Sequence, residues 1–320
     1  MSNDVLVLAE HQGGALCTVT FELAGRAREL ADAWGGQVQV ALLGASNLAG
    51  QLGSADVVFT AEHPALADYN PEAYERVLLS IVHARTPRLV LLSTATAGLD
   101  LSAALSVGWD APVVSSVVGL SAEGEGALAT AQIYGGKLLA EVELAGSRAV
   151  CAVIAGSFPA AAGRRDRPPA VEAIDAAAVL DGLRTSVTGV VTAEAGDVDI
   201  TAADVLVSVG RGIGSRDDLE VAEELADALG APLAGSRPLT DQGWLPKSRQ
   251  VGKSGVTVKP KLYLALGISG APEHVEGMRD AELVIACNTD AKAPIFDVAH
   301  YGTTVDLFDL VPELVKRLKP

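Results

Sequence analysis

The chain has few aromatic side chains and no long apolar run. Phe, Trp and Tyr make up 4% of its 320 residues, whereas hydrophobic residues make up 49%. The cores must therefore consist of Ala, Val and Leu packed between helices and strands, which favours an α/β fold. No apolar run reaches about eighteen residues, and no basic region opens the N-terminus, so neither a membrane span nor a secretory signal is predicted. We expect a cytoplasmic protein without membrane insertion.

Cysteine and positive charge are also scarce. Cys17, Cys151 and Cys287 lie far apart, with no Cys-x-x-Cys motif and no histidine at metal-ligand spacing. This pattern favours buried, reduced thiols over a metal site or a redox disulfide. The formal charge of −16 argues against a nucleic-acid partner, because such binding requires basic surface. A protein partner or a small ligand fits this charge better.

Strand-type and helical patterns alternate through the first part of the chain. The length suggests two domains, at roughly 100–200 residues each. Strand-type runs stand at residues 4–9, 38–44, 88–93, 112–119 and 187–193, and helical patterns at 21–36 and 71–85. The pattern predicts a parallel or mixed α/β domain of flavodoxin-like or Rossmann-like type over residues 1–194. We place the boundary near residue 195, ahead of a second domain at 195–320.

The second domain opens with a predicted strand at residues 204–209, a glycine turn and a helix. Glycine stands at every second position of residues 210–214, Ser215 is the expected helix N-cap, and Gly230 ends the helix. The spacing lacks the third glycine of a dinucleotide fingerprint, and no acidic residue follows a clear second strand. Two interpretations stay open: the helix start binds a pyrophosphate, or the glycines only permit a tight turn.

Three more strands are predicted in the second domain, at residues 262–266, 281–290 and 303–308, with a closing helix at 310–319. In parallel sheets, ligands bind beyond the carboxyl ends of the strands. The turns after the strands, together with the strand end at Asp306, are therefore expected to converge on one crevice. These strands give the second domain a parallel sheet.

Residues 250–255, Gln-Val-Gly-Lys-Ser-Gly, contain the last residues of a P-loop motif. Lys247 stands where the opening glycine should be, and a strand-type pattern at 256–260 follows in place of a helix. The segment is therefore not predicted to bind ATP or GTP. Six basic residues and one acid lie between residues 236 and 261. They form either a solvated loop or a pocket for an anion.

Five segments together resemble the α-subunit of electron transfer flavoprotein: residues 5–16, 210–215, 234–255, 262–278 and 284–314. The resemblance runs through essentially the whole chain. It implies a heterodimer with a β-subunit that carries AMP or a second flavin, with residues 1–194 contacting that partner and residues 195–320 holding one FAD. It also implies an electron carrier rather than an enzyme. Electrons would arrive from flavin dehydrogenases, such as the acyl-CoA dehydrogenases of fatty acid β-oxidation, and leave singly to a membrane quinone reductase.

The resemblance also implies roles for single residues. His274 matches a histidine that stabilises the anionic semiquinone as a donor or a cation, Arg237 matches a flavin-adjacent arginine, and Ser254 supplies a hydroxyl near N5. Asn288 and Asp306 would contact the ribityl chain or the adenosine. The other implied binding positions are Arg211, Ser236, Gln250, Val251, Gly252, Lys253, Ser269, Gly270, Ala271, Pro272, Glu273 and Leu307.

Three residues depart from the family pattern. Ser254 replaces a threonine and keeps the hydroxyl but loses the methyl group that stiffens χ1. Glu273 replaces a glutamine and His300 an aspartate, and both changes bear on redox tuning and on the choice of partner. We expect the Glu273 carboxylate to point to solvent, as charged side chains usually do.

One alternative function stays open. The second domain would then belong to a dinucleotide-dependent enzyme that uses NAD, with Arg237, Glu273 and His274 as substrate groups. Yellow protein with flavin absorption favours the carrier, and colourless protein that binds NADH favours the enzyme. No Ser-His-Asp arrangement or nucleophile elbow is visible, so no catalytic residue is predicted.

Overall fold

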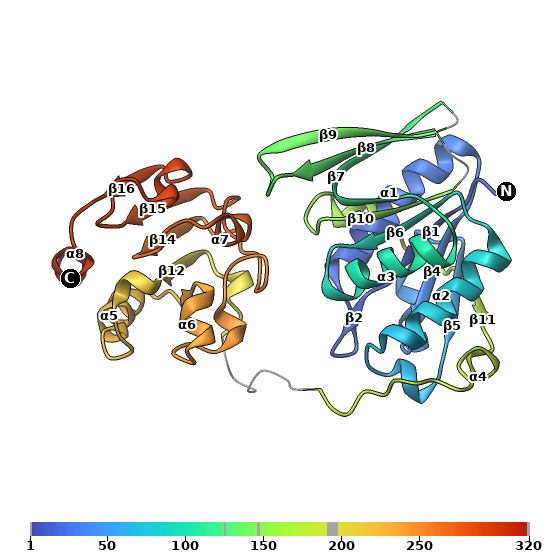
Figure 1. The fold of residues 1–320 in the computed structure, drawn as a ribbon, viewed down its shortest axis with the longest axis horizontal. Coiled ribbons are helices and arrows are strands. Elements are labelled where there is room, and N and C mark those ends of the chain that lie inside the picture. The colour runs from blue at the N-terminus through green and yellow to red at the C-terminus, as the bar shows by residue number, and fades with distance from the viewer. Residues whose placement is uncertain (1, 125, 146–147, 191–197, 319–320) are drawn as a thin grey trace. The chain divides into compact units, whose positions relative to one another are not determined.

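Residues 1–190 and residues 191–320 form two units of the chain (Figure 1). The computed structural model describes residues 2–124, 126–145, 148–190 and 198–318. The boundary predicted near residue 195 lies within residues 191–197, outside the described residues, so the division into 1–194 and 195–320 stays a prediction.

The first unit is built on a nine-stranded mixed sheet with the order β11-β5-β4-β1-β6-β10-β7-β8-β9. Every neighbouring pair from β11 to β7 is parallel, whereas β8 is antiparallel to β7 and to β9. The strands are β1 (Val5–Leu8), β4 (Val38–Leu43), β5 (Val57–Ala61), β6 (Leu89–Ser93), β7 (Val113–Glu123), β8 (Gly126–Ile133), β9 (Leu138–Leu144), β10 (Ala149–Val153) and β11 (Ala170–Ala173), with a small hairpin of β2 (His11–Gln12) and β3 (Ala15–Leu16). The order of β5, β4, β1 and β6 is that of a Rossmann-type sheet, as predicted.

Helices cover both faces of this sheet (Figure 1). Alternate residues of a strand point to opposite faces, so Val5 packs with Leu23 of α1, whereas Leu6 packs with Leu78 of α2. The α-helices are α1 (Thr18–Trp34), α2 (Pro71–Arg85), α3 (Thr96–Gly108) and the short α4 (Ala176–Val179); the 3₁₀ helices are η1 (Ser46–Gln51), η2 (Pro64–Leu66) and η3 (Ala160–Gly163). The helix predicted at 71–85 is confirmed at both ends, and α1 ends at Gly35, whose φ of 69° is left-handed.

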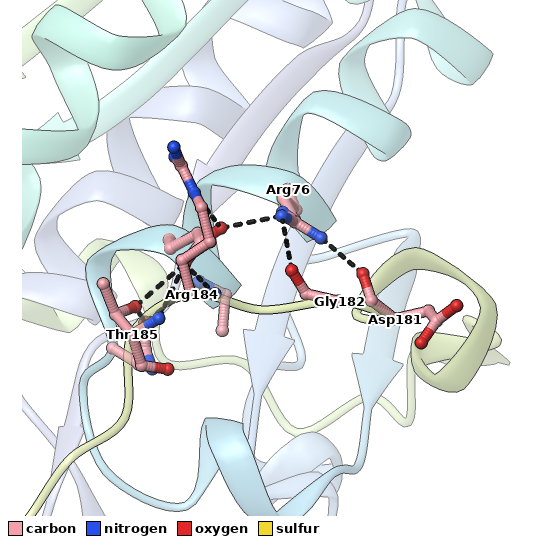
Figure 2. A network of polar contacts seen from close by, with 8 residues as sticks. Arg76, Asp181, Gly182, Arg184 and Thr185 are labelled. Carbon is pink, nitrogen blue, oxygen red and sulfur yellow. Dashed lines mark hydrogen bonds and ion pairs between the residues drawn. The ribbon is translucent and has the colours of Figure 1, made fainter.

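The segment after α4 is tied to α2 by a network of polar contacts, in which the Arg76 side chain donates to the carbonyls of Asp181 and Gly182 (Figure 2). Glu72 accepts hydrogen bonds from the backbone N–H groups of Arg184 and Thr185, at 2.8 and 3.0 Å, and from the Arg76 guanidinium at 2.7 Å. Desolvation raises the pKa of Glu72, but hydrogen bonds from the backbone and side chains of Arg184 and Thr185 together outweigh it and lower the pKa to about 2. The strand predicted at 187–193 is wrong for residues 187–190, which are exposed and outside any strand; the remaining three residues are not among the described ones.

The second unit is built on a five-stranded parallel sheet with the order β13-β12-β14-β15-β16. Its strands are β12 (Val205–Val209), β13 (Leu233–Gly235), β14 (Leu262–Leu266), β15 (Leu283–Cys287) and β16 (Tyr301–Thr303). Its helices are α5 (Leu219–Leu229), α6 (Arg237–Asp241), α7 (Pro272–Glu276) and α8 (Leu307–Leu318), with 3₁₀ helices η4 (Ile200–Ala202), η5 (Arg211–Ile213), η6 (Lys247–Arg249) and η7 (Pro294–Asp297). Leu264 packs with Leu225 of α5 and Val311 of α8, whereas Tyr263 faces the layer that contains Val251 and Met278.

Several boundaries in the second unit differ from the predictions: β15 is Leu283–Cys287 in place of 281–290, and the closing helix α8 begins at Leu307 in place of residue 310. The last strand is β16, Tyr301–Thr303, because Asp306 begins a helix: its Oδ1 accepts a hydrogen bond from the N–H of Phe308 at 3.0 Å. Ser215 is not the N-cap of α5, since that helix starts at Leu219 after Asp218. The Ser215 hydroxyl instead donates to the Asp218 carboxylate at 2.6 Å.

Candidate functional site

A cavity of about 740 Å³ lies at the carboxyl ends of the strands of the second unit. Residues following β12, β13, β14 and β15 line it, and the strand order changes direction between β12 and β14. Such a switch point is where open α/β sheets bind ligands, and the volume lies within the roughly 300–1,000 Å³ of cofactor sites. Of the predicted binding residues, the cavity is lined by Arg211, Ser236, Arg237, Gln250, Val251, Gly252, Lys253, Ser254, Ser269, Ala271, Glu273, His274 and Asn288.

Four predicted binding residues do not line this cavity. Gly270 packs so closely against the next loop that a Cβ atom there would lie 2.2 Å from the Ile295 nitrogen, and Pro272 opens α7. Asp306 precedes α8, and Leu307 is buried in the core beside α5. A binding role for these four residues stays a prediction. Lining residues that were not predicted are Gly212, Pro238, Gly267, Ile268, Asp290, Ala293 and Pro294.

The glycines after β12 allow two turns of the chain to pack closely together. A Cβ atom on Gly210 would lie 2.3 Å from the Gly267 carbonyl oxygen, and one on Gly212 would lie 2.7 Å from the Gly267 Cα. The N–H of Gly212 also donates to the carbonyl of Gly267 at 3.0 Å. The turn after β12 therefore packs directly on the turn after β14, which explains alternate glycines without a dinucleotide fingerprint.

Residues 250–256 form a closed loop on the cavity wall. The Val256 N–H donates to the Gln250 carbonyl at 2.8 Å, and the Lys253 N–H donates to the Glu273 carbonyl at 2.7 Å. Gly252 has a φ of 131°, and a Cβ atom there would lie 2.7 Å from the Glu273 oxygen, so only glycine fits. The predicted strand at 256–260 is wrong, because only Val256 forms a bridge, with Val251. With no helix after it, this loop is not a P-loop.

A chain of polar side chains orients the Ser254 hydroxyl. Gln250 is 2% exposed; its amide nitrogen donates to Ser254 Oγ at 2.8 Å, and its amide oxygen lies 2.7 Å from the Thr240 hydroxyl. Because Ser254 Oγ accepts from the amide, its own proton is free for a ligand in the cavity. Thr240 was not among the predicted residues, and it acts from behind the cavity wall.

His274 is the most deeply placed titratable side chain of the predicted set. It is 6% exposed, and its Nε2 lies 2.9 Å from the Tyr263 hydroxyl. Burial lowers its pKa to about 4, and the backbone of Val251 offsets part of that shift, so the ring is neutral near pH 7. Of the two roles predicted for His274, a donor agrees with this pKa and a cation does not. No hydrogen bond of normal geometry reaches Nδ1 in the part of the chain described.

The predicted cluster of basic residues is divided in the structure. Arg237 and Lys253 of the cluster line the cavity, and Arg237 also pairs with Asp241 at 3.2 Å; Arg211, which lies outside the cluster, lines the cavity too. The other basic residues of the cluster lie outside the cavity lining: Lys247, Arg249, Lys259 and Lys261. The anion-pocket interpretation therefore applies to Arg237 and Lys253, and the solvated-loop interpretation to the exposed Lys247, Lys259 and Lys261, whereas Arg249 is half-buried and donates to the Leu233 carbonyl.

Two other predicted positions have clear structural contacts. The Asn288 side chain donates to the Ile268 carbonyl at 2.8 Å, so it joins the turns after β14 and β15 at the cavity. His300 accepts a hydrogen bond from the Val284 N–H at 3.0 Å and does not line the cavity. Glu273 lies on the cavity wall and is exposed.

The remaining predictions concern cysteines and membrane segments. Cys151 and Cys287 are buried as expected, and burial raises the pKa of the Cys151 thiol to about 12. Cys17 is only half-buried, which corrects the expectation for that residue. Within the described ranges, no group of three or more His, Cys, Asp or Glu side chains could hold a metal ion. Nor does any helix there have the length and apolar character to cross a bilayer.

Comparison with known proteins places the chain in a family. Residues 5–179 match the family model of the electron transfer flavoprotein domain, and residues 199–279 match that of the electron transfer flavoprotein FAD-binding domain. The chain belongs to the electron transfer flavoprotein family. It is 34% identical to the electron transfer flavoprotein subunit alpha of Thermoanaerobacterium thermosaccharolyticum, over 99% of this chain and 98% of that one.

Two further relatives of this chain have other names. It is 35% identical to the protein FixB of Clostridium saccharobutylicum, over 98% of this chain and 96% of that one. It is 36% identical to the acryloyl-CoA reductase electron transfer subunit beta of Anaerotignum propionicum, over 99% and 95%. The predicted resemblance to the α-subunit of electron transfer flavoprotein is therefore confirmed, and residues 199–279 form an FAD-binding domain.

The cavity has features that suit this cofactor. Arg211 and Arg237 supply positive charge, the Ser254 hydroxyl has a proton to donate, and Nδ1 of His274 has no hydrogen bond of normal geometry within the described residues. FAD carries phosphates and ring carbonyls that accept hydrogen bonds, so the donor set matches it. The bound group would supply the electron chemistry, while the chain supplies binding, orientation and electrostatics.

Proposed function

We propose that the chain is the α-subunit of a heterodimeric electron transfer flavoprotein and that it holds FAD in the cavity at the carboxyl ends of β12, β13, β14 and β15. The observation that carries the proposal is the set of donors around this cavity in a domain whose family binds FAD. Electrons enter from flavin dehydrogenases, with acyl-CoA dehydrogenases as the model donors, and leave singly to a membrane quinone reductase. The subunit has no substrate turnover of its own.

Each side chain has a defined task in this proposal. The neutral His274 ring and the Ser254 hydroxyl donate hydrogen bonds to the isoalloxazine, where reduction places negative charge. Arg237 adds positive charge at the cavity mouth, which favours an anion in a partly dry site. Membership of the family and the position of these side chains on the turns that line the cavity support the assignments. The individual contacts between these side chains and FAD are part of the proposal.

The partner belongs to the proposal as well. We expect a β-subunit that carries AMP or a second flavin, because the cavity is open to solvent along exposed residues such as Ser254 and Ser269. The relative named as an electron transfer subunit of acryloyl-CoA reductase makes an acyl-CoA-linked partner plausible for this family. We place the complex in the cytoplasm.

Co-expression with the partner subunit tests the proposal. The purified complex should be yellow, with flavin absorption and about one FAD per α-chain, and its melting temperature should rise with FAD and with the partner, since both bind only the folded state. The chain alone should bind FAD more weakly. Colourless complex that binds NADH in place of FAD would overturn the proposal and favour the dinucleotide-dependent enzyme.

A further inference from the structure

Tyr263 lies behind His274, in a part of the second unit that solvent does not reach. Tyr263 is 0% exposed on β14, and its hydroxyl oxygen lies 2.9 Å from His274 Nε2. The ring centroids are 6.2 Å apart, with the planes tilted by 58°. Tyr263 does not line the cavity, so it can act on a ligand there only through the histidine.

Two arrangements of protons are compatible with this hydrogen bond. If the Tyr263 hydroxyl donates to Nε2, the neutral imidazole carries its proton on Nδ1. If Nε2–H donates to the Tyr263 oxygen, the phenolic proton needs another acceptor in the interior. Burial raises the pKa of Tyr263, and the Ser208 hydroxyl opposes part of that rise, which is the effect of a donor rather than of an acceptor. The first arrangement therefore satisfies Tyr263.

The surroundings of Nδ1 are compatible with a proton on that atom. The backbone of Val251 favours the protonated ring, because it offsets part of the fall in the pKa of His274. No hydrogen bond of normal geometry ends at Nδ1 among the described residues, while Nε2 is occupied by Tyr263. Val251 and His274 both line the cavity, and Nδ1 itself lies buried within the cavity wall.

We infer that Tyr263 is a positioning residue that holds the neutral His274 ring in the tautomer with its proton on Nδ1. The cavity wall thereby contains an uncharged ring whose orientation is fixed by a buried hydrogen bond. A donor held in place before charge develops needs no reorganisation when the charge appears. The inference rests on the proposed function only where it names FAD as the ligand; the tautomer itself is argued from the contacts of His274.

Nitrogen-15 NMR of the full chain labelled at histidine measures this tautomer directly. His274→Gln assigns the signals, and at neutral pH wild-type protein should show Nδ1 protonated and Nε2 unprotonated. Tyr263→Phe removes the donor to Nε2, and the ratio of the two tautomers should fall by about three- to tenfold, as for the loss of one hydrogen bond. Tyr74→Phe removes a buried hydroxyl that bonds the Leu43 carbonyl in the first unit, and it should leave the ratio unchanged.

A second readout uses the FAD-loaded complex. Tyr263→Phe should lower the first reduction potential of the flavin, because the donor from His274 is no longer held, whereas Tyr74→Phe should not change it. A proton on Nε2 in wild-type protein would overturn the inference even if Tyr263→Phe failed to fold, and so would an unchanged tautomer ratio in a folded Tyr263→Phe. A wild-type chain with the Nδ1 tautomer but no affinity for FAD would keep the inference and overturn the proposed function.

Discussion

At the carboxyl ends of β1 and β6 in the first unit, the Ser93 hydroxyl donates to the Glu10 carboxylate, and Thr20 Oγ1 bonds both the N–H and the C=O of Glu10 at 2.8 Å. At the same edge of the sheet in the second unit, His274 lines a cavity of about 740 Å³, and its Nδ1 has no hydrogen bond of normal geometry among the described residues. Both edges are formed by parallel strands, and helices cover the faces of both sheets. Parallel strands with helices on the sheet faces are therefore not enough for a ligand site, which also needs donors that the fold has not already paired.

Gly252→Ala should have the largest effect on the cofactor site of the second unit. The new Cβ atom would lie 2.7 Å from the Glu273 oxygen at a φ of 131°, so the loop at residues 250–256 must move. A strained backbone of this kind costs about 1–3 kcal/mol, and we expect FAD binding to weaken by roughly 10- to 100-fold. Fluorescence titration of the apoprotein with FAD measures the change.

Gly50→Ala is the matched control in the first unit. Nothing lies within 4 Å of a Cβ atom at Gly50, and this glycine needs no left-handed conformation. Its FAD affinity and melting temperature should equal those of wild-type protein. If Gly252→Ala bound FAD as tightly as Gly50→Ala does, the loop would not be part of the site.

The second-largest expected effect is a difference between the two units in how their stability depends on pH. The pKa of His274 is lowered to about 4 from about 6.5, so the second unit is fully stable above about pH 6.5 and loses up to on the order of 3 kcal/mol as the pH falls toward 4. In the first unit, the pKa of Glu72 is lowered to about 2, so its contribution is present above about pH 4.3 and is lost only below that.

The second unit should therefore unfold first on acidification. Hydrogen exchange resolved by unit, at about pH 7 and about pH 5, measures both stabilities. His274→Gln has no titratable ring and should flatten the pH dependence of the second unit, while Glu72→Gln should change only the first unit. Equal stability of the second unit of wild-type protein at the two pH values would contradict the buried, neutral histidine.

Thr240→Val tests the support of Ser254 with a smaller expected effect. The variant keeps the shape but cannot donate to the Gln250 amide oxygen, 2.7 Å away. Loss of one neutral hydrogen bond costs about 1 kcal/mol, so FAD affinity should fall roughly fivefold. Thr257→Val, at an exposed position outside the cavity lining, serves as the control and should bind FAD normally. An unchanged affinity in Thr240→Val would remove Thr240 from the site.

Glu273→Gln should have the smallest effect. Glu273 is exposed on the cavity wall, so solvent screens its charge, and the reduction potential of bound FAD should hardly move. Potentiometric titration of variant and wild-type protein at two salt concentrations measures it. A clear upward shift that shrinks at high salt would mean that the carboxylate points toward the flavin.

The sequence predicted those elements that have clear local boundaries. The strand at Leu262–Leu266 is an apolar run between a lysine and a glycine, and α2 starts at Pro71 after the N-cap Asn70, so both were found at their true ends. Residues 187–190 have the composition of a strand but pair with no neighbour in the described chain. A strand needs a partner, and the partner cannot be read from a local pattern.

The candidate site also contains residues that a local sequence pattern could not predict. The resemblance identified His274 and Ser254, and the sequence placed the turns that carry them. Tyr263 and Thr240 were missed, because an isolated Tyr in an apolar strand reads as a core residue and an isolated Thr as a surface residue. Their contacts cross 11 and 10 residues of chain and depend on how α7 and residues 250–256 pack, which only the fold decides.

Hydrogen exchange of the complex, with FAD removed and then restored, tests the central claim most directly. The account predicts that FAD slows exchange at residues 210–214, 250–256 and 267–276, and leaves residues 9–20 and 92–98 of the first unit unchanged. Slowed exchange at the carboxyl ends of β1 and β6 without any change at residues 250–276 would contradict the account.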